Sequence, residues 1–269
     1  MTLRLGWFTA GRGPGSRGMF QAALDAIDAG RLDAEVEFVF MHRERGEGEG
    51  SDGFIALAES RGIPIVTHSS KRFREARGDF ASYREAFDAR SMELLSPLPP
   101  PDLCVLAGYL LILSDPIVAA FPFVNLHAAL PGGPVGLWQK VIWELIDQRA
   151  EETGAMVFHV TPELDRGPPV AYARFPLRGE PFDALWQAAD GASARELAAA
   201  QGEAHPLFAA IRKHGLAREP LLLVETLRLL AVGEVRVGGG QITERDGRPA
   251  PPRDLTALVD AALTAEAAR

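Results

Sequence analysis

The sequence predicts an α/β fold in which helices cover both faces of a mostly parallel central sheet, with a small C-terminal hairpin and helix appended. Three observations predict this class. Short apolar runs recur along the chain, helix-periodic stretches separate them, and glycine- or proline-rich segments stand between the two. Parallel neighbours need crossover connections, which helices supply, so the alternation favours a sheet that is covered on both faces.

The elements follow from these patterns in chain order. Apolar runs predict strands at 3–9, 36–41, 63–67, 103–107, 124–126, 155–160 and 170–177. Helical spacing predicts helices at 19–27, 54–61, 138–148, 220–232 and 255–268. Residues 235–237 and 241–243 are expected to form a hairpin across Gly238-Gly239-Gly240. We expect a main domain over residues 1–218 and an extension over 219–269 that packs on it.

Composition excludes several classes of protein. The 269 residues are 47% hydrophobic, enough for a sizeable core, and the net charge of −8 without a long basic cluster argues against a nucleic-acid partner. The single cysteine, Cys104, excludes an internal disulfide. No run approaches the length of a membrane span, and the apolar start is too short for a secretion signal. We therefore expect a cytoplasmic protein without a membrane partner, either a monomer or a homodimer.

Polar residues that directly follow strands are the first candidates for chemistry, because ligands of such sheets bind beyond the carboxyl ends of the strands. Asn125 and His127 lie two apart at a strand end and hence on one face, while Leu126 points to the other. Asp165 follows the next strand, before Arg166-Gly167. Each has a plain alternative: an Asn-x-His pair can cap a loop, and Asp165 suits a turn.

A glycine-rich segment at 11–18 joins the first strand to the first helix. Its backbone amides and the helix N-terminus suit a phosphate, although a plain tight turn explains the composition equally well. The spacing matches neither a dinucleotide fingerprint nor a P-loop. The six histidines are His42, His68, His127, His159, His205 and His214. They are scattered along the chain without the spacing of metal ligands, so we expect no bound metal.

Several motifs together resemble the core of the folate-dependent formyltransferases, most closely the glycinamide ribonucleotide formyltransferases. They are Asn125-Leu126-His127, Leu130-Pro131 with its glycine loop, and Glu163-Leu164-Asp165 followed by Gly167-Pro168. Residues 102–109, and later Glu203, His205 and Leu207, extend the resemblance over most of residues 3–240. It implies a Rossmann-like formyltransferase fold with residues 1–218 as its catalytic domain. It also implies 10-formyltetrahydrofolate as co-substrate, small-molecule substrates only and no metal.

The resemblance implies that Asn125, His127 and Asp165 are the catalytic residues, and their chemistry fits that reaction. When an amine attacks a formyl carbon, negative charge develops on the formyl oxygen, and Asn125 and His127 can donate hydrogen bonds to it. Asp165 would hold His127 charged and oriented, and could relay the proton of the amine through a water.

The resemblance also implies binding residues. The substrate phosphate would be held by Gly11, Arg12, Gly13, Gly15, Ser16 and Arg17. The folate would meet Arg84 with its glutamate tail and the slot formed by Leu106, Gly108, Tyr109, Leu110 and Ile112 with its pteridine. Glu203 would lie near the substrate amine. The plain alternatives are a surface arginine for Arg84 and an ordinary helix glutamate for Glu203.

Departures from the family pattern leave the acceptor open. Leu111 stands where an arginine is usual, Trp138-Gln139-Lys140 replaces a histidine-rich helix start, Pro14 lengthens the glycine loop, and Phe158 precedes His159 where the family has histidine one position earlier. We expect formyl transfer to glycinamide ribonucleotide. Another sugar or nucleotide amine is the alternative, as is hydrolysis of the same donor, although hydrolases commonly carry an N-terminal regulatory domain for which a strand at residue 3 leaves no room. Initiator tRNA is disfavoured by the acidic charge, and a non-catalytic folate-binding protein by the intact catalytic residues.

Overall fold

The computed structural model describes residues 2–77 and 80–267, and each strand expected from the sequence is present. The strands are β1 (Leu3–Thr9), β2 (Ala34–Met41), β3 (Ile65–Thr67), β4 (Leu103–Leu106), β5 (Phe123–His127), β6 (Glu152–His159), β7 (Pro169–Pro176), β8 (Val235–Gly238), β9 (Gln241–Glu244) and β10 (Arg253–Asp254). The helices are α1 (Pro14–Asp28), α2 (Glu49–Ser60), α3 (Ser70–Arg77), α4 (Phe80–Leu95), α5 (Asp115–Ala120), α6 (Trp138–Asp147), α7 (Phe182–Ala188), α8 (Ala194–Gln201), the short 3-10 helix η1 (Gly202–Ala204), α9 (Pro206–Ala231) and α10 (Thr256–Ala267).

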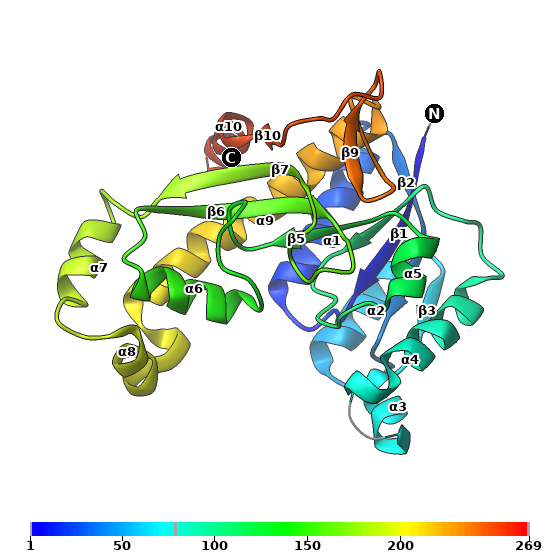
Figure 1. Cartoon of the computed structure of the whole chain (residues 1–269), viewed down its shortest axis with the longest axis horizontal. Coiled ribbons are helices and arrows are strands. Elements are labelled where there is room, and N and C mark those ends of the chain that lie inside the picture. The colour runs from blue at the N-terminus through cyan, green and yellow to red at the C-terminus, as the bar shows by residue number, and fades with distance from the viewer. Residues whose placement is uncertain (1, 78–79, 268–269) are drawn as a thin grey trace.

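The predicted fold class is confirmed. One large sheet has the strand order β10-β7-β6-β5-β4-β1-β2-β3, and β8 pairs with β9 in a separate hairpin (Figure 1). The strands β5, β4, β1, β2 and β3 lie side by side in this order and all run parallel to one another. Strand β6 runs antiparallel to both of its neighbours, β5 and β7. In the hairpin, Gly239 and Gly240 both have positive φ, the backbone that a two-residue turn of this kind requires.

Alternation along β1 explains how helices come to cover both faces of the sheet. Leu5 and Trp7 point to the face covered by α1 and α9, where the Trp7 ring lies 5.1 Å from that of Phe20. Phe8 points to the opposite face, where its ring lies 5.1 Å from that of Phe123, in the cluster that α4 and α5 complete. Burying each such side chain stabilises the fold by about 1.5–3 kcal/mol.

The strands β6 and β7 are antiparallel because the segment 160–168 between them contains no helix, so the chain turns straight back. Beyond this pair, α6, α7, α8 and the start of α9 enclose a second apolar core around Phe175, Trp186 and Phe208. Figure 1 shows α7 and α8 at one end of the molecule and α3 and α4 at the other. The site candidates of β5 and of the β6–β7 loop therefore lie between these two ends.

Helix α9 begins earlier than the sequence predicts. A start at Pro220 was expected because proline suits the first turn of a helix and disrupts an interior. The helix instead begins at Pro206 and contains Pro220, because buried residues before it, such as Leu207 and Ile211, pack the first half of the helix into the second core. The boundary expected at residue 218 thus falls inside α9, and the division into two parts stays a prediction. No helix within residues 2–77 and 80–267 has the length and apolar character needed to cross a membrane.

Replacing Gly215 with alanine is expected to raise the free energy of unfolding by about 0.5–1 kcal/mol, because glycine weakens a helix interior and no atom lies within 4 Å of the added Cβ. Gly233, at the end of α9, has φ 68°. Gly233→Ala is the control and should lower stability instead, because alanine is strained there. Urea unfolding midpoints measure both, and a shift of the same sign in the two variants would contradict the helix bounds.

Candidate active site

Strand β5 places two of the three catalytic candidates together. It lies between β4 and β6, with Asn125 paired to Leu106 on one side and Phe158 on the other. His127 is buried at the strand end, and its Nε2 lies 2.8 Å from the carbonyl oxygen of Pro134. Nε2–H therefore donates to that carbonyl, which fixes the ring orientation and leaves Nδ1 as the nitrogen available to a substrate.

Asp165, in the segment between β6 and β7, contacts the loop that contains Pro134. It lies between β6 and β7 with φ 51°, a left-handed backbone that non-glycine residues rarely adopt. Its Oδ2 accepts a hydrogen bond of 3.0 Å from the backbone N–H of Gly136. The loop 134–136 thus binds both His127 and Asp165. Among the described residues no hydrogen bond joins the two side chains, so Pro134, rather than Asp165, orients the imidazole.

Gly167 allows the loop that carries Asp165 to close against β6. A Cβ at this position would stand 1.7 Å from the carbonyl oxygen of His159. Only glycine permits so close an approach between the two backbones. The adjoining hydrogen bond from His159 N–H to the Pro168 carbonyl, 2.9 Å long, holds the chain at this point.

The structure separates Phe158 from His159, as a shift of one residue in a strand requires. Phe158 is buried opposite Asn125, and its ring meets the His127 ring edge to face with centroids 6.5 Å apart. His159 pairs with Val124 and its Nδ1 lies 3.0 Å from the Phe123 carbonyl oxygen. His159 is therefore a buried structural residue, while an apolar ring stands beside His127.

The loop after β4 contains the residues expected to line the pteridine slot. Gly108 and Leu110 have positive φ, so this loop turns tightly before α5. Leu110 and Ile112 are exposed, whereas the Leu106 and Tyr109 side chains are buried and can offer only backbone groups to a ligand.

The loop between β4 and α5, residues 107–114, is called the slot loop below. It is held against α4 by the side chain of Asp88. Its Oδ2 accepts a 2.6 Å hydrogen bond from the Ser114 N–H, at the start of α5. Burial raises the pKa of the Asp88 carboxyl above its usual range, and the hydrogen bonds with Ser114, followed by the charge of Arg84, partly oppose this rise. Arg84 is half-buried one turn before Asp88 on the same helix, so it lies on the element that holds the slot loop.

The glycine-rich segment is a shorter turn than the sequence predicts. Helix α1 begins at Pro14, with Gly13 as its N-cap, so Gly15, Ser16 and Arg17 lie in its first turn rather than in the loop. Pro14 explains the early start, because its fixed φ suits the first helical position. The Ser16 hydroxyl donates to the Gly13 carbonyl oxygen, 3.0 Å away.

The turn keeps the features of an anion site. Amide groups in the first turn of a helix have no partner within the helix and point outward. The guanidinium groups of Arg12 and Arg17 are exposed, and neither has an ion-pair partner among the described residues.

Glu203 lies on η1, exposed, where it lines a groove of about 460 Å³ between α6 and α9. Trp138 and Arg212 line the same groove. Trp138 begins α6 directly after the loop 134–137, which ties the groove to the loop that holds His127 and Asp165. The structure thus places Glu203 on the rim of this groove rather than in hydrogen-bond contact with the three catalytic candidates.

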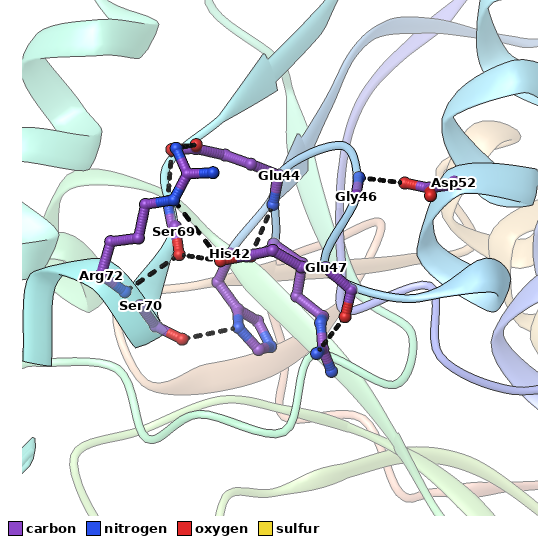
Figure 2. Close-up of polar contacts among 9 residues, drawn as sticks. His42, Glu44, Gly46, Glu47, Asp52, Ser69, Ser70 and Arg72 are labelled. Atoms are coloured by element: carbon purple, nitrogen blue, oxygen red, sulfur yellow. Dashed lines mark hydrogen bonds and ion pairs between the residues drawn. The ribbon is translucent and has the colours of Figure 1, made fainter. Parts of the chain in front are cut away.

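A buried polar cluster lies at the end of β2, and the sequence pattern did not predict it (Figure 2). His42 is buried, with Nδ1 3.0 Å from the Ser70 hydroxyl oxygen and its ring edge-on to Tyr109 of the slot loop, centroids 5.2 Å apart. Around it, Ser69 Oγ donates to Glu47, and Arg72 pairs with Glu44. The cluster ties the loop after β2 to the start of α3. A histidine directly after a strand was the available signal.

Burial lowers the pKa of His42 to about 4, which makes stability depend on pH. In the unfolded chain this histidine takes up a proton near pH 6.5. Its contribution to stability is therefore complete above pH 6.5 and is lost as the pH falls toward 4, by about 3 kcal/mol in full.

We expect the free energy of unfolding to fall less steeply between pH 7 and pH 4 in His42→Gln than in the parent, by about that amount. Denaturant unfolding at several pH values measures the difference. Parallel curves for the two proteins would show that His42 is not the group responsible.

The fold and site together define a class: an α/β enzyme with an amide and an imidazole at the carboxyl end of a parallel strand, and a carboxylate that is hydrogen-bonded to the loop after that strand. The formyl transferase family model matches residues 13–180, more than half of the chain. The chain belongs to the formyl transferase family. This confirms the enzyme class expected from the sequence, which is a formyltransferase with 10-formyltetrahydrofolate as co-substrate.

Individual proteins of known sequence or structure are also similar to this chain. Phosphoribosylglycinamide formyltransferase of Escherichia coli K12 is 29% identical over 167 residues, which cover 61% of this chain and 70% of that protein. Glycinamide ribonucleotide transformylase 1 of Symbiobacterium toebii superposes with a TM-score of 0.64 at 24% identity, covering 90% of this chain and 94% of the other. Formyltetrahydrofolate deformylase of Pseudomonas syringae has the same TM-score at 18% identity, with coverage of 91% and 66%. The structural matches at these identities establish the fold.

Proposed function

We propose that this enzyme transfers the formyl group of 10-formyltetrahydrofolate to the amine of glycinamide ribonucleotide. The observation that carries the proposal is the loop 134–136, which hydrogen-bonds both Asp165 and His127, the latter two residues after Asn125 on β5. We further propose that the enzyme acts in purine synthesis in the cytoplasm, as a monomer or homodimer. Its ligands would be small molecules and not nucleic acid.

In the proposed reaction the amine nitrogen attacks the formyl carbon, and the bond from that carbon to the folate N10 breaks. The side-chain amide of Asn125 donates to the oxygen on which negative charge develops. His127 donates from Nδ1 when its ring is protonated, because Nε2–H is already held by Pro134. Asp165 accepts the proton that leaves the amine, through a water, and returns it to the departing N10.

An apolar rim supports folate as the donor. Four large apolar side chains are exposed on the loops after β4, before α6 and between β6 and β7, with Leu110 47%, Ile112 41%, Leu137 58% and Leu164 51% accessible. Leu137 and Leu164 each adjoin one partner of the hydrogen bond between Gly136 and Asp165, and exposed apolar side chains beside a site favour a binding surface. The flat rings of the folate would cover this rim, and Arg84 on α4 would meet the carboxylates of its tail.

The turn before α1 supports a phosphorylated acceptor. Its outward amides belong to Gly13, Gly15 and Ser16, and Arg12 and Arg17 add two guanidinium groups without ion-pair partners among the described residues. A phosphate there would gain charge-assisted hydrogen bonds from both.

The test follows the release of tetrahydrofolate from 10-formyltetrahydrofolate, with and without glycinamide ribonucleotide. Release that requires the ribonucleotide is the expected result. Equal release without it would establish hydrolysis instead. Release that needs a different sugar or nucleotide amine would retain the chemistry and replace the acceptor.

A further inference from the structure

The slot loop is held near both of its ends, and its shape depends on those contacts. The Gly108 carbonyl oxygen accepts a 3.0 Å hydrogen bond from the Ala10 N–H, and at the other end the Ser114 N–H donates to Asp88. Between these contacts Leu110 is exposed and has φ 67°. A left-handed backbone is unfavourable for leucine, so the surrounding contacts must hold the loop in this conformation.

His42 contacts the slot loop from the end of β2. Its ring is perpendicular to that of Tyr109, with the centroids 5.2 Å apart, and both side chains are buried. Nδ1 of His42 lies 3.0 Å from the hydroxyl oxygen of Ser70, at the start of α3 (Figure 2). The Ser70 N–H also donates to the His42 carbonyl oxygen, over 3.1 Å. Helix α3 therefore fixes one side of the imidazole, and the slot loop packs against it.

The second ring nitrogen of His42 is directed to the backbone of the slot loop. Nε2 is buried and makes no hydrogen bond within the part of the chain that the structure describes. Burial lowers the pKa of His42 to about 4, and the Tyr109 backbone opposes this fall. A backbone group raises the pKa of an imidazole when it is an acceptor, so the Tyr109 carbonyl oxygen faces the ring. Because Ser70 binds Nδ1, Nε2–H is the donor left for that carbonyl.

We propose that His42 is a positioning residue for the folate, because it sets the position of the Tyr109 backbone and with it the slot loop. The inference rests on the proposed function in one respect, the binding of the folate at this loop, and it is independent of the acceptor. Nδ1 holds the ring to α3, while Nε2–H holds the Tyr109 carbonyl. A buried donor without a partner is unfavourable, so the loop position that completes this bond is favoured.

Asparagine and glutamine separate the roles of the two nitrogens. His42→Asn keeps a polar atom near the place of Nδ1 and lacks the reach of Nε2, whereas His42→Gln keeps an N–H near the place of Nε2. His42→Asn should raise KM for 10-formyltetrahydrofolate about 3- to 10-fold, the effect of one hydrogen bond, with kcat little changed. His42→Gln should have a KM close to that of the parent. Loss of packing alone would affect the two variants alike.

A calorimetric titration of the whole enzyme with tetrahydrofolate, the product of the donor, tests the same order without an acceptor. The affinity should fall about 3- to 10-fold in His42→Asn and stay close to the parent value in His42→Gln. If His42→Asn fails to fold, Ser70→Ala replaces it, because it removes the partner of Nδ1 and leaves the histidine. Ser70→Ala should weaken tetrahydrofolate binding a few-fold.

His68 provides the matched control. It directly follows β3 as His42 follows β2, and its Nδ1 also lies beside a serine hydroxyl, 3.1 Å from Ser91 Oγ. Its ring contacts are Phe73 and Phe87, on α3 and α4 rather than on the slot loop. His68→Asn should therefore leave KM and the tetrahydrofolate affinity unchanged.

Parent-like KM and affinity in His42→Asn would overturn the proposal, and so would equal losses in His42→Asn and His42→Gln. Unchanged binding by Ser70→Ala, or no binding of tetrahydrofolate to the parent, would overturn it as well. If the affinities follow the expected order but tetrahydrofolate release does not depend on glycinamide ribonucleotide, the proposed acceptor is wrong and the role of His42 stands.

Discussion

Replacing His127 with alanine is expected to lower kcat for formyl transfer by about a hundredfold or more. The loss corresponds to one hydrogen-bond donor at a developing oxyanion, which typically stabilises the transition state by about 2.7–4 kcal/mol. Asn125→Ala removes a donor to the same oxygen and should give a loss of the same order. The double variant should lose less than the product of the two, because the donors act on one charge. Tetrahydrofolate release measures all three.

His159 is the matched control for His127. Both are buried histidines on neighbouring strands, but Nδ1 of His159 bonds the Phe123 carbonyl oxygen. His159→Asn should therefore lower the midpoint of thermal unfolding while kcat of the folded enzyme changes only a few-fold. A loss of kcat as large as that of His127→Ala, with the folded state intact, would contradict the assignment of the two histidines.

Replacing Gly167 with alanine is expected to lower the free energy of unfolding by roughly 3 kcal/mol and to lower activity as well. The added Cβ would stand 1.7 Å from the carbonyl oxygen of His159, so the two backbones must separate. That movement displaces the loop that places Asp165 against Gly136. Urea unfolding and tetrahydrofolate release measure the two losses.

Gly238→Ala is the control for Gly167→Ala, because no atom lies within 4 Å of its added Cβ and its φ is not positive. It should change stability by less than about 1 kcal/mol. Equal losses in the two variants would show that the close approach at His159 is not what the substitution disturbs.

The fold was predictable from the sequence where local pattern and packing agree. Apolar runs identified the strands, and alternation along β1 gave both faces of the sheet. Helix starts were predicted less well. Pro220 favours a start, but the packing of Leu207 and Ile211 extends α9 back to Pro206. That packing depends on α6 and α7, which are distant in the sequence, so a local pattern could not indicate it.

The site was predictable where it depends on strand geometry. Two-residue spacing placed Asn125 and His127 together, and the parity of Phe158 and His159 placed them on opposite faces. The anchoring of His127 and Asp165 was not predictable, because both bind backbone atoms of the loop 134–136. Backbone contacts of a loop leave no trace in residue types. The groove lined by Arg212 was not predictable either, because it forms only where α9 packs beside α6 in the folded chain.

In the proposed reaction, Asn125, His127 and Asp165 catalyse formyl transfer from 10-formyltetrahydrofolate to a phosphorylated amine. Carbon NMR with a carbon-labelled formyl group on the donor tests it most directly, because the label reports where the carbon goes. In the presence of glycinamide ribonucleotide, the label should move to an N-formyl amide on the ribonucleotide, at a rate about a hundredfold lower in His127→Ala. Label in formate at the same rate with or without the ribonucleotide, or transfer undiminished in His127→Ala, would contradict the account.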